Sequence, residues 1–191
     1  MQQHLLEQRE LSREELLDLR NKRTAVTIFQ FSWILVFVCL IIANLSLRGN
    51  FVSWPPPGVQ PLDPVLPTIA TIGLIVSAVL ARGSFQAIQN DQRDSFRRQW
   101  GIALALGGIF VLIMAYEWIS VPPSGMYGTL FRVMTAFHAV HALVIGYIIY
   151  RVYGNAASYN AVHNWAVEAS VKLWYFVVVA WILFFAVLYI I

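Results

Sequence analysis

Charged side chains are scarce in this sequence of 191 residues. They make up 12% of the chain, whereas hydrophobic residues make up 59%, and a soluble domain usually carries about 25% charged residues. The few charges also gather in short blocks that separate long apolar runs. This composition argues against a water-soluble domain and indicates an integral membrane protein.

Cysteine and histidine are also rare, which limits the redox chemistry that the chain could hold. The single cysteine, Cys39, lies inside an apolar run, so a disulfide within the chain and a copper pair held by two cysteines are both excluded. Four histidines are too few for a catalytic core of haem and copper. We therefore expect this chain to contain no catalytic residue and to bind no metal and no cofactor itself.

Signatures of soluble enzymes and of nucleic-acid binding are absent as well. The sequence has no glycine-rich phosphate loop, no Cys-x-x-Cys, no His-Glu-x-x-His and no nucleophile elbow. The net charge of +3 is small, and the cations lie beside apolar runs rather than along a basic stripe. We therefore expect no nucleic acid partner.

Five apolar runs are long enough to cross a bilayer. The hydrocarbon core is about 30 Å thick, and a helix needs about 20 apolar residues to cross it. Because lipid offers no hydrogen bonds to the backbone, these runs are predicted to be helices. The sequence therefore predicts an all-α, polytopic membrane protein, a bundle of five transmembrane helices over residues 24–47, 62–81, 100–120, 130–150 and 171–191.

Residues 1–23 are predicted to form a cytoplasmic N-terminal arm. They carry five cations and five anions with scattered leucines, which is not the pattern of a cleavable signal peptide. Ser12 to Glu15 fits a capping box that starts a helix. Two interpretations stay open: an amphipathic helix that rests on a partner or on the lipid surface, or a solvated and partly frayed segment.

Lysine and arginine are unevenly distributed between the two predicted sides of the membrane. The arm, the connection over residues 82–99 and the connection before the last run carry eleven of the thirteen, and the other side holds Arg48 and Arg132. Cytoplasmic segments are enriched in these residues. We therefore expect the N-terminus inside and the C-terminus outside, in a bacterial cytoplasmic (inner) membrane.

His138 and His141 are polar residues inside the fourth apolar run. They are three residues apart, so a helix places them on one face, and His141 falls near the middle of the bilayer. One hypothesis makes them metal or haem ligands, although a metal site needs about three or four donors. A second, which we favour, has both histidines hydrogen-bonded across helices to Glu117, Thr135 or a backbone carbonyl. A third has them facing a lipid head group or a partner subunit.

Glu117 and Arg132 are charges inside the third and fourth runs, where ionisable groups are functional candidates by default. Both fall near the outer surface and a short loop joins their helices, so we expect a salt bridge between them. A proton-transfer role for Glu117 is the alternative, but the sequence supplies no polar chain through the membrane. Glu168 lies four residues before Lys172, so these two are expected to form an ion pair on one helix face.

Five short motifs follow one another along the chain from about residue 25 to its end. They are Trp54-Pro55-Pro56-Pro57-Gly58 with Pro61-Leu62, then Ala115-Tyr116-Glu117-Trp118, then Tyr127-Gly128-Thr129 with Phe131, then Thr135-Ala136-Phe137-His138-Ala139-Val140-His141, and last the set Glu168, Trp174, Phe176, Trp181 and Tyr189. In order and in spacing they resemble the motifs of the cytochrome c oxidase subunit III family.

The resemblance implies the short, five-helix form of that subunit, which docks against subunit I of a haem–copper oxidase, with subunit II in the same complex. Haem and copper would lie in the partner, which reduces oxygen to water and pumps protons. This chain would bind phospholipid and support the stability and proton uptake of the complex. The residues singled out as polar contacts to lipid or to another subunit are Glu117, Arg132, His138, His141, Glu168 and Trp174.

The chain also departs from the family pattern. Trp33 stands where the family often has a glutamate, and Tyr175 and Val178 stand where the last helix usually has a histidine and an aspartate. These departures keep a second function open, that of an accessory subunit III-like protein of nitric oxide reductase. A third function, from another class, is a small stand-alone transporter or proton channel.

Overall fold

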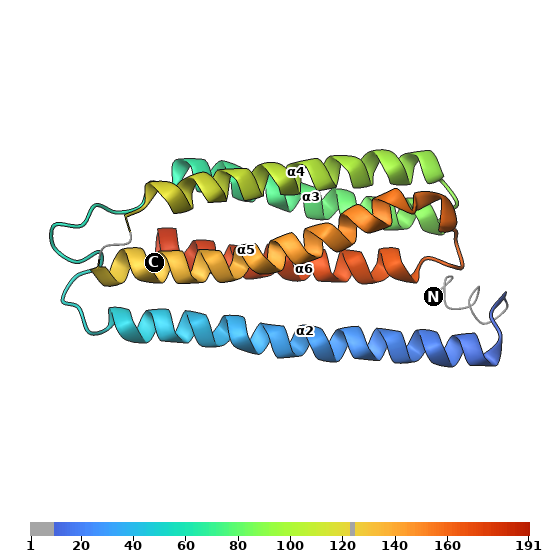
Figure 1. The fold of residues 1–191 in the computed structure, drawn as a ribbon, viewed down its shortest axis with the longest axis horizontal. Helices are drawn as coiled ribbons and strands as arrows, with labels where there is room; N and C mark the ends of the chain where they lie inside the picture. The colour runs from blue at the N-terminus through green and yellow to red at the C-terminus, as the bar shows by residue number, and fades with distance from the viewer. Residues whose placement is uncertain (1–9, 123–124) are drawn as a thin grey trace.

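The computed structural model describes residues 10–122 and 125–191, and these residues contain five long helices and no strand (Figure 1). Each of the five is long and apolar enough to cross a membrane. The predicted all-α bundle of five transmembrane helices is therefore confirmed. The helices are α2 (Arg13–Arg48), α3 (Val65–Gln89), α4 (Arg93–Ser120), α5 (Gly125–Gly154) and α6 (Trp165–Phe185), with a 3-10 turn η1 (Ala156–Ser158) before α6 and a π-helical stretch η2 (Ala186–Ile190) after it.

Helix α2 begins within the predicted arm rather than at the first apolar run. The Ser12 hydroxyl accepts a hydrogen bond from the Glu15 N–H at 3.3 Å, and the Ser12 N–H donates to the Glu15 carboxylate at 2.8 Å, so the predicted capping box is confirmed. From Arg13 the helix continues without a break through the first apolar run. This part of the arm is a helical extension of the span, whereas residues 1–9 lie outside the described part of the chain.

Helix α3 shows how the helices differ in extent from the apolar runs. It begins at Val65, not near Leu62, because the Leu62 N–H donates to the Tyr127 hydroxyl at 3.0 Å and the Asp63 carboxylate accepts from the Val65 N–H at 3.0 Å. The helix then continues past residue 81 to Gln89. Hydropathy marks the part of a helix that lies in hydrocarbon, and the helical backbone continues beyond it into polar surroundings.

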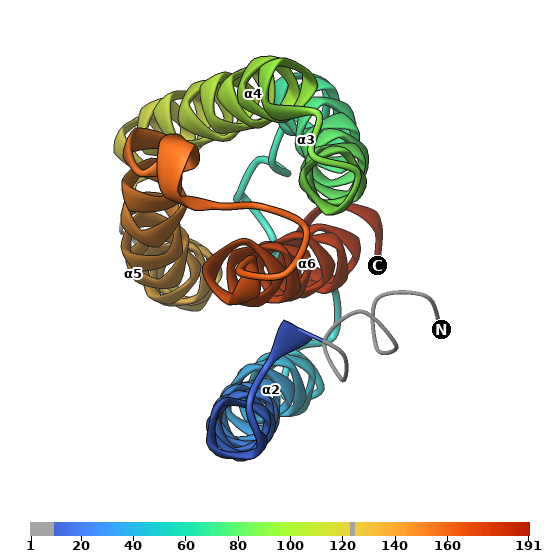
Figure 2. The same cartoon turned by 90° about the vertical axis from the view of Figure 1, so that its right-hand side faces the viewer.

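Four of the described helices form a ring, and the other lies outside it. Looking along the helices, Figure 2 shows α3, α4, α5 and α6 around the ring and α2 beside α6. Helices α3 and α4 share the largest interface of the bundle. Helix α2 buries only Phe37 and Asn44, so most of its surface faces the surroundings of the protein.

Tryptophan side chains join the helices of the ring. The indole N–H of Trp181 donates to the Thr71 hydroxyl at 2.8 Å, and that of Trp174 donates to the Ser77 hydroxyl at 3.0 Å, so α6 is joined twice to α3. Between α4 and α5, the Trp100 N–H donates to a backbone carbonyl at 3.0 Å. Lipid supplies no hydrophobic force between helices, so such bonds and close packing hold a membrane bundle together.

Gly107 of α4 lies against the ring of Trp174. A Cβ atom at this position would lie 2.7 Å from Cη2 of that ring, and the hydrogen bond to Ser77 keeps the indole from moving away. At Gly108, the next residue, a Cβ would meet nothing within 4 Å. Because Gly107 has no side chain, α4 can approach α6 closely at this position.

We expect Gly107→Ala to destabilise the bundle by about 1–3 kcal/mol, because the added methyl group overpacks the contact with Trp174. Gly108→Ala is the matched control, since it makes the same chemical change one residue away in open space. The measurement is the midpoint of unfolding of the purified protein in a titration of denaturing detergent. Equal stability of the two variants would contradict the prediction.

Candidate functional site

One carboxylate binds two cations at the end of the bundle where α2 and α6 begin. Glu168, in the first turn of α6, accepts from the Arg23 guanidinium at 2.7 and 3.0 Å and from the Lys172 ammonium at 2.8 Å. The Glu168 side chain is 11% exposed, so its charge depends on these partners. The predicted Glu168–Lys172 ion pair is confirmed, and the structure adds Arg23, which joins α2 to α6. Charged hydrogen bonds of this kind are the strong ones.

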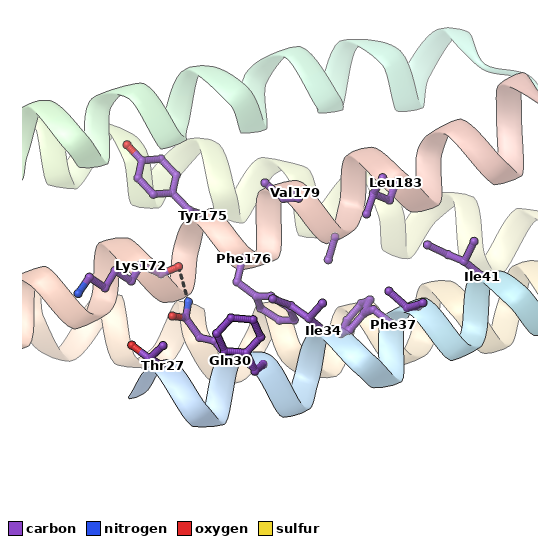
Figure 3. A pocket seen from close by; sticks show the side chains of 13 residues that line it. Thr27, Gln30, Ile34, Phe37, Ile41, Lys172, Tyr175, Phe176, Val179 and Leu183 are labelled. Carbon is purple, nitrogen blue, oxygen red and sulfur yellow. Dashed lines mark hydrogen bonds between the residues drawn. The ribbon is translucent and has the colours of Figure 1, made fainter. Parts of the chain in front are cut away.

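A groove of about 470 Å³ runs between α2 and α6 from these charges toward the middle of the bundle (Figure 3). At its polar end, the Gln30 side-chain amide donates to the Lys172 carbonyl at 2.9 Å, shown as the dashed line in Figure 3. Beyond that bond the walls are apolar. They include Ile34, Phe37 and Ile41 on α2 and Phe176, Val179 and Leu183 on α6.

A second, smaller hollow of about 260 Å³ lies between α3 and α6. Polar side chains line it, among them Arg82 and Gln86 of α3 together with Glu168. Lys172 and Tyr175 line both this hollow and the groove. The charged cluster therefore lies where a polar hollow and an apolar groove meet.

His138 is surrounded by aromatic rings. Neither of its ring nitrogens has a hydrogen-bond partner among the described residues, so the predicted hydrogen bond from His138 across helices does not form. The rings lie at centroid distances of 5.4 to 6.2 Å and belong to Phe37, Phe110, Trp181 and Phe184.

The groups expected to bind His138 are engaged elsewhere. Thr135 donates its hydroxyl to the Phe131 carbonyl of its own helix at 2.6 Å, and Glu117 lies farther along α4, toward the end of that helix. Residues 10–122 and 125–191 hold no group of three or more His, Cys, Asp or Glu that could bind a metal ion. Aromatic rings from α2, α4 and α6 pack around His138 instead.

His141 lies on the same side of α5 and faces α2. Its Nδ1 lies 2.8 Å from the Phe137 carbonyl, so it binds a backbone carbonyl as expected, but on its own helix rather than across helices. The ring meets Trp33 edge-on at 4.3 Å and Phe37 at 5.2 Å between centroids. Because His138 also contacts Phe37, the two histidines share a helix face as predicted.

The predicted salt bridge between Glu117 and Arg132 does not form. The Arg132 guanidinium donates to the Val121 carbonyl at 2.8 and 3.1 Å and lies 4.4 Å over the Trp118 ring. Val121 follows the last turn of α4, where backbone carbonyls have no partner within the helix. Its carbonyl oxygen is therefore available to accept from the Arg132 guanidinium. Glu117 instead lines a polar hollow of about 420 Å³ together with Asp63.

Two of the sequence motifs meet at the end of the bundle opposite the charged cluster. The Trp54 ring lies 5.2 Å from the Tyr127 ring between centroids, and the Tyr127 hydroxyl accepts from the Leu62 N–H. The proline-rich loop before α3 is thus fixed to the start of α5. The contact brings two motifs that are far apart in the sequence together in space.

The sequence matches the family model for cytochrome c oxidase subunit III over residues 18–191. The chain belongs to the cytochrome c oxidase subunit III family. It is 33% identical over 171 residues to cytochrome c oxidase subunit 3 of Thermostichus vulcanus, an alignment that covers 85% of this chain and 84% of the relative. The same protein of Synechocystis sp. is 29% identical, with coverages of 86% and 73%, and that of Lumbricus terrestris is 30% identical, with coverages of 72% and 55%. The resemblance drawn from the motifs is confirmed.

Trp33, which the resemblance places where the family often has a glutamate, lies among aromatic rings. Its indole lies between Phe29 at 4.3 Å and His141 at 4.3 Å, with Phe176 at 5.7 Å, all measured between ring centroids. An aromatic side chain here packs α2 against α5 and α6. A glutamate would instead bring a charge to His141.

We expect Glu168→Gln to weaken the attachment of α2, because it removes the carboxylate that Arg23 and Lys172 share. The loss of stability should be about 1.5–3 kcal/mol, as for hydrogen bonds to charged groups, and amide hydrogen exchange over residues 13–30 should become faster. Asp18→Asn is the control, since the exposed Asp18–Lys22 pair lies within α2 and such pairs contribute about 0.3–0.5 kcal/mol. Equal effects of the two changes would show that Glu168 does not hold α2.

Proposed function

We propose that this subunit III supports the catalytic subunit I of a haem–copper terminal oxidase, with subunit II in the same complex, and carries no redox centre itself. Haem and copper belong to the partner. This chain contributes stability and phospholipid binding, and it supports proton uptake by the partner.

The observation that supports the proposal is how the polar side chains of the bundle are used. The indole N–H groups of Trp174 and Trp181 join α6 to α3, and Glu168 joins α6 to α2. His138 is enclosed by aromatic rings. The indole and carboxylate contacts hold helices of the same chain together, which is the chemistry of a scaffold.

In the proposed orientation, the end of the bundle that carries Arg23 and Glu168 faces the cytoplasm. Figure 1 shows that the α3–α4 connection and η1 lie at this end and that the C-terminal stretch η2 lies at the other. Eleven of the thirteen lysines and arginines then lie inside, as the positive-inside rule requires. The membrane would be a bacterial cytoplasmic membrane.

The test is native purification of the tagged chain in mild detergent, followed by an optical spectrum of the eluate. We expect haem absorbance to co-elute with the chain, together with oxygen reduction, and neither to appear from untagged membranes. Elution without any haem-containing partner would remove the proposal. Reduction of nitric oxide in place of oxygen would support the alternative, an accessory subunit of nitric oxide reductase.

We further expect His141→Leu to lower the yield of the intact complex several-fold while the helix content of the chain stays the same. His141 is half-buried between α5 and α2, beside Trp33 and Phe37, so a change there alters the contact of α2 with α5 and the surface next to it. Tyr147→Phe, on an exposed position of α5, is the control. The measurements are the yield after native purification and circular dichroism. An unchanged yield for His141→Leu would refute the expectation.

A further inference from the structure

A hollow of about 370 Å³ lies between α4 and α5, which are neighbours in the ring of helices (Figure 2). It extends from exposed residues, among them Leu143, which is 58% exposed, to the buried side chains of His138 and Trp181. We propose that this hollow binds a small, neutral and mainly apolar molecule with one hydroxyl group, which forms a hydrogen bond with His138. The inference goes beyond the proposed function and does not depend on it.

His138 is a polar side chain without a partner in the wall of this hollow. It is 2% exposed, and neither ring nitrogen has a hydrogen-bond partner among the described residues. A neutral imidazole has one donor and one acceptor nitrogen, and a buried polar group without a partner is costly. A hydroxyl group donates as well as accepts, so it satisfies the nitrogen that it reaches in either tautomer.

The imidazole has to turn for this hydrogen bond to form, because the surrounding rings cover both of its nitrogens. The torsion that turns the ring is χ2, whose energy profile is broad. Phe110 and Trp181 contact the imidazole and also line the hollow. The ring therefore stands at the wall of the hollow, and this turn brings a nitrogen to the ligand.

The depth of His138 in the membrane requires a neutral ligand. From Gly125 to His138, α5 advances thirteen residues, or about 20 Å, and about 24 Å of helix remain to Gly154. The hydrocarbon of one leaflet is only half of about 30 Å thick, and a charge near its middle is expensive. A phospholipid would bring only an acyl chain to His138, which leaves the imidazole without a hydrogen bond.

The two helices are joined on both sides of the hollow, which argues against a transmembrane helix as occupant. Toward the outer end, the Trp118 indole N–H donates to the Arg132 carbonyl at 3.2 Å. Toward the inner end, the Trp100 indole N–H donates to the Ile149 carbonyl at 3.0 Å. A partner helix crosses both leaflets, whereas this space ends between these two bonds. Its volume lies within the range of about 300–1,000 Å³ that is usual for small-molecule sites.

The test is photolabelling of the natively purified protein in lipid nanodiscs. The probe is octanol that carries a photoreactive diazirine group, and mass spectrometry locates the labelled residues. We expect Val140, which lines the hollow, to be labelled several-fold more than Val79 of α3, although the two valines are 60% and 66% exposed. Equal labelling of the two would overturn the proposal.

Competition by unlabelled molecules tests the hydroxyl group. Decanol should reduce the labelling of Val140 several-fold more than decane does at the same mole fraction, because only decanol forms a hydrogen bond with His138. His138→Phe keeps a planar ring among the aromatic neighbours and removes both nitrogens. In this variant decanol and decane should compete equally, and a preference for decanol that persists would contradict the role of His138.

Ala139→Trp tests the hollow itself, because Ala139 is a lining residue and the indole ring fills the space. The labelling of Val140 should fall several-fold. Val144→Trp is the matched control, since Val144 is on the same helix, is 50% exposed and does not line the hollow. Circular dichroism checks that each variant is folded, and equal labelling of the two variants would contradict the site.

A partner helix remains distinguishable from the proposed ligand. Labelling that appears only after detergent removes accompanying subunits would show that a partner covers the hollow and would overturn the proposal. The label is located on this chain and the haem spectrum is read separately, so failure of this site and failure of the proposed function are different results.

Discussion

The ion pair between Arg23 and Glu168 determines where α2 lies on the bundle. Helix α2 buries only two of its residues, so apolar packing alone holds it weakly. The guanidinium reaches the carboxylate at the polar end of the bundle, and Arg48 binds backbone carbonyls at the other end. The helix is thus held at both ends, where charged groups are least costly, and its middle leaves the groove beside α6.

The interior of the four-helix ring is held by a different kind of contact. Charges are expensive in hydrocarbon, and here the joining groups are neutral indole N–H donors and hydroxyl acceptors. Around His138, aromatic rings take the place of hydrogen-bonding groups. Neutral groups therefore join α6 to α3 inside the four-helix ring.

The exposed surface of the subunit also differs between its apolar middle and its charged end. Helix α2 carries large apolar side chains that do not line the groove, including Ile28, Leu35 and Ile42, which are 62%, 65% and 56% exposed. Lipid or another membrane subunit is the environment that such side chains require. Among the described residues, most lysines and arginines lie at the end of the bundle that carries Arg23 and Glu168, so the two ends of the bundle differ in charge.

The sequence by itself determined the number and kind of the helices, the cap at Ser12, the ion pair between Glu168 and Lys172 and the family, because these depend on hydropathy, local spacing and motif order.

Only the tertiary structure decided which side chains from distant segments contact one another. Arg23 and Glu168 are 145 positions apart, and no local pattern relates them. Arg132 likewise binds the Val121 carbonyl rather than Glu117, because the end of α4 offers an unpaired backbone acceptor that side-chain charges do not reveal. His138 lies among rings from three other helices, and which side chains meet in three dimensions follows from how the helices pack.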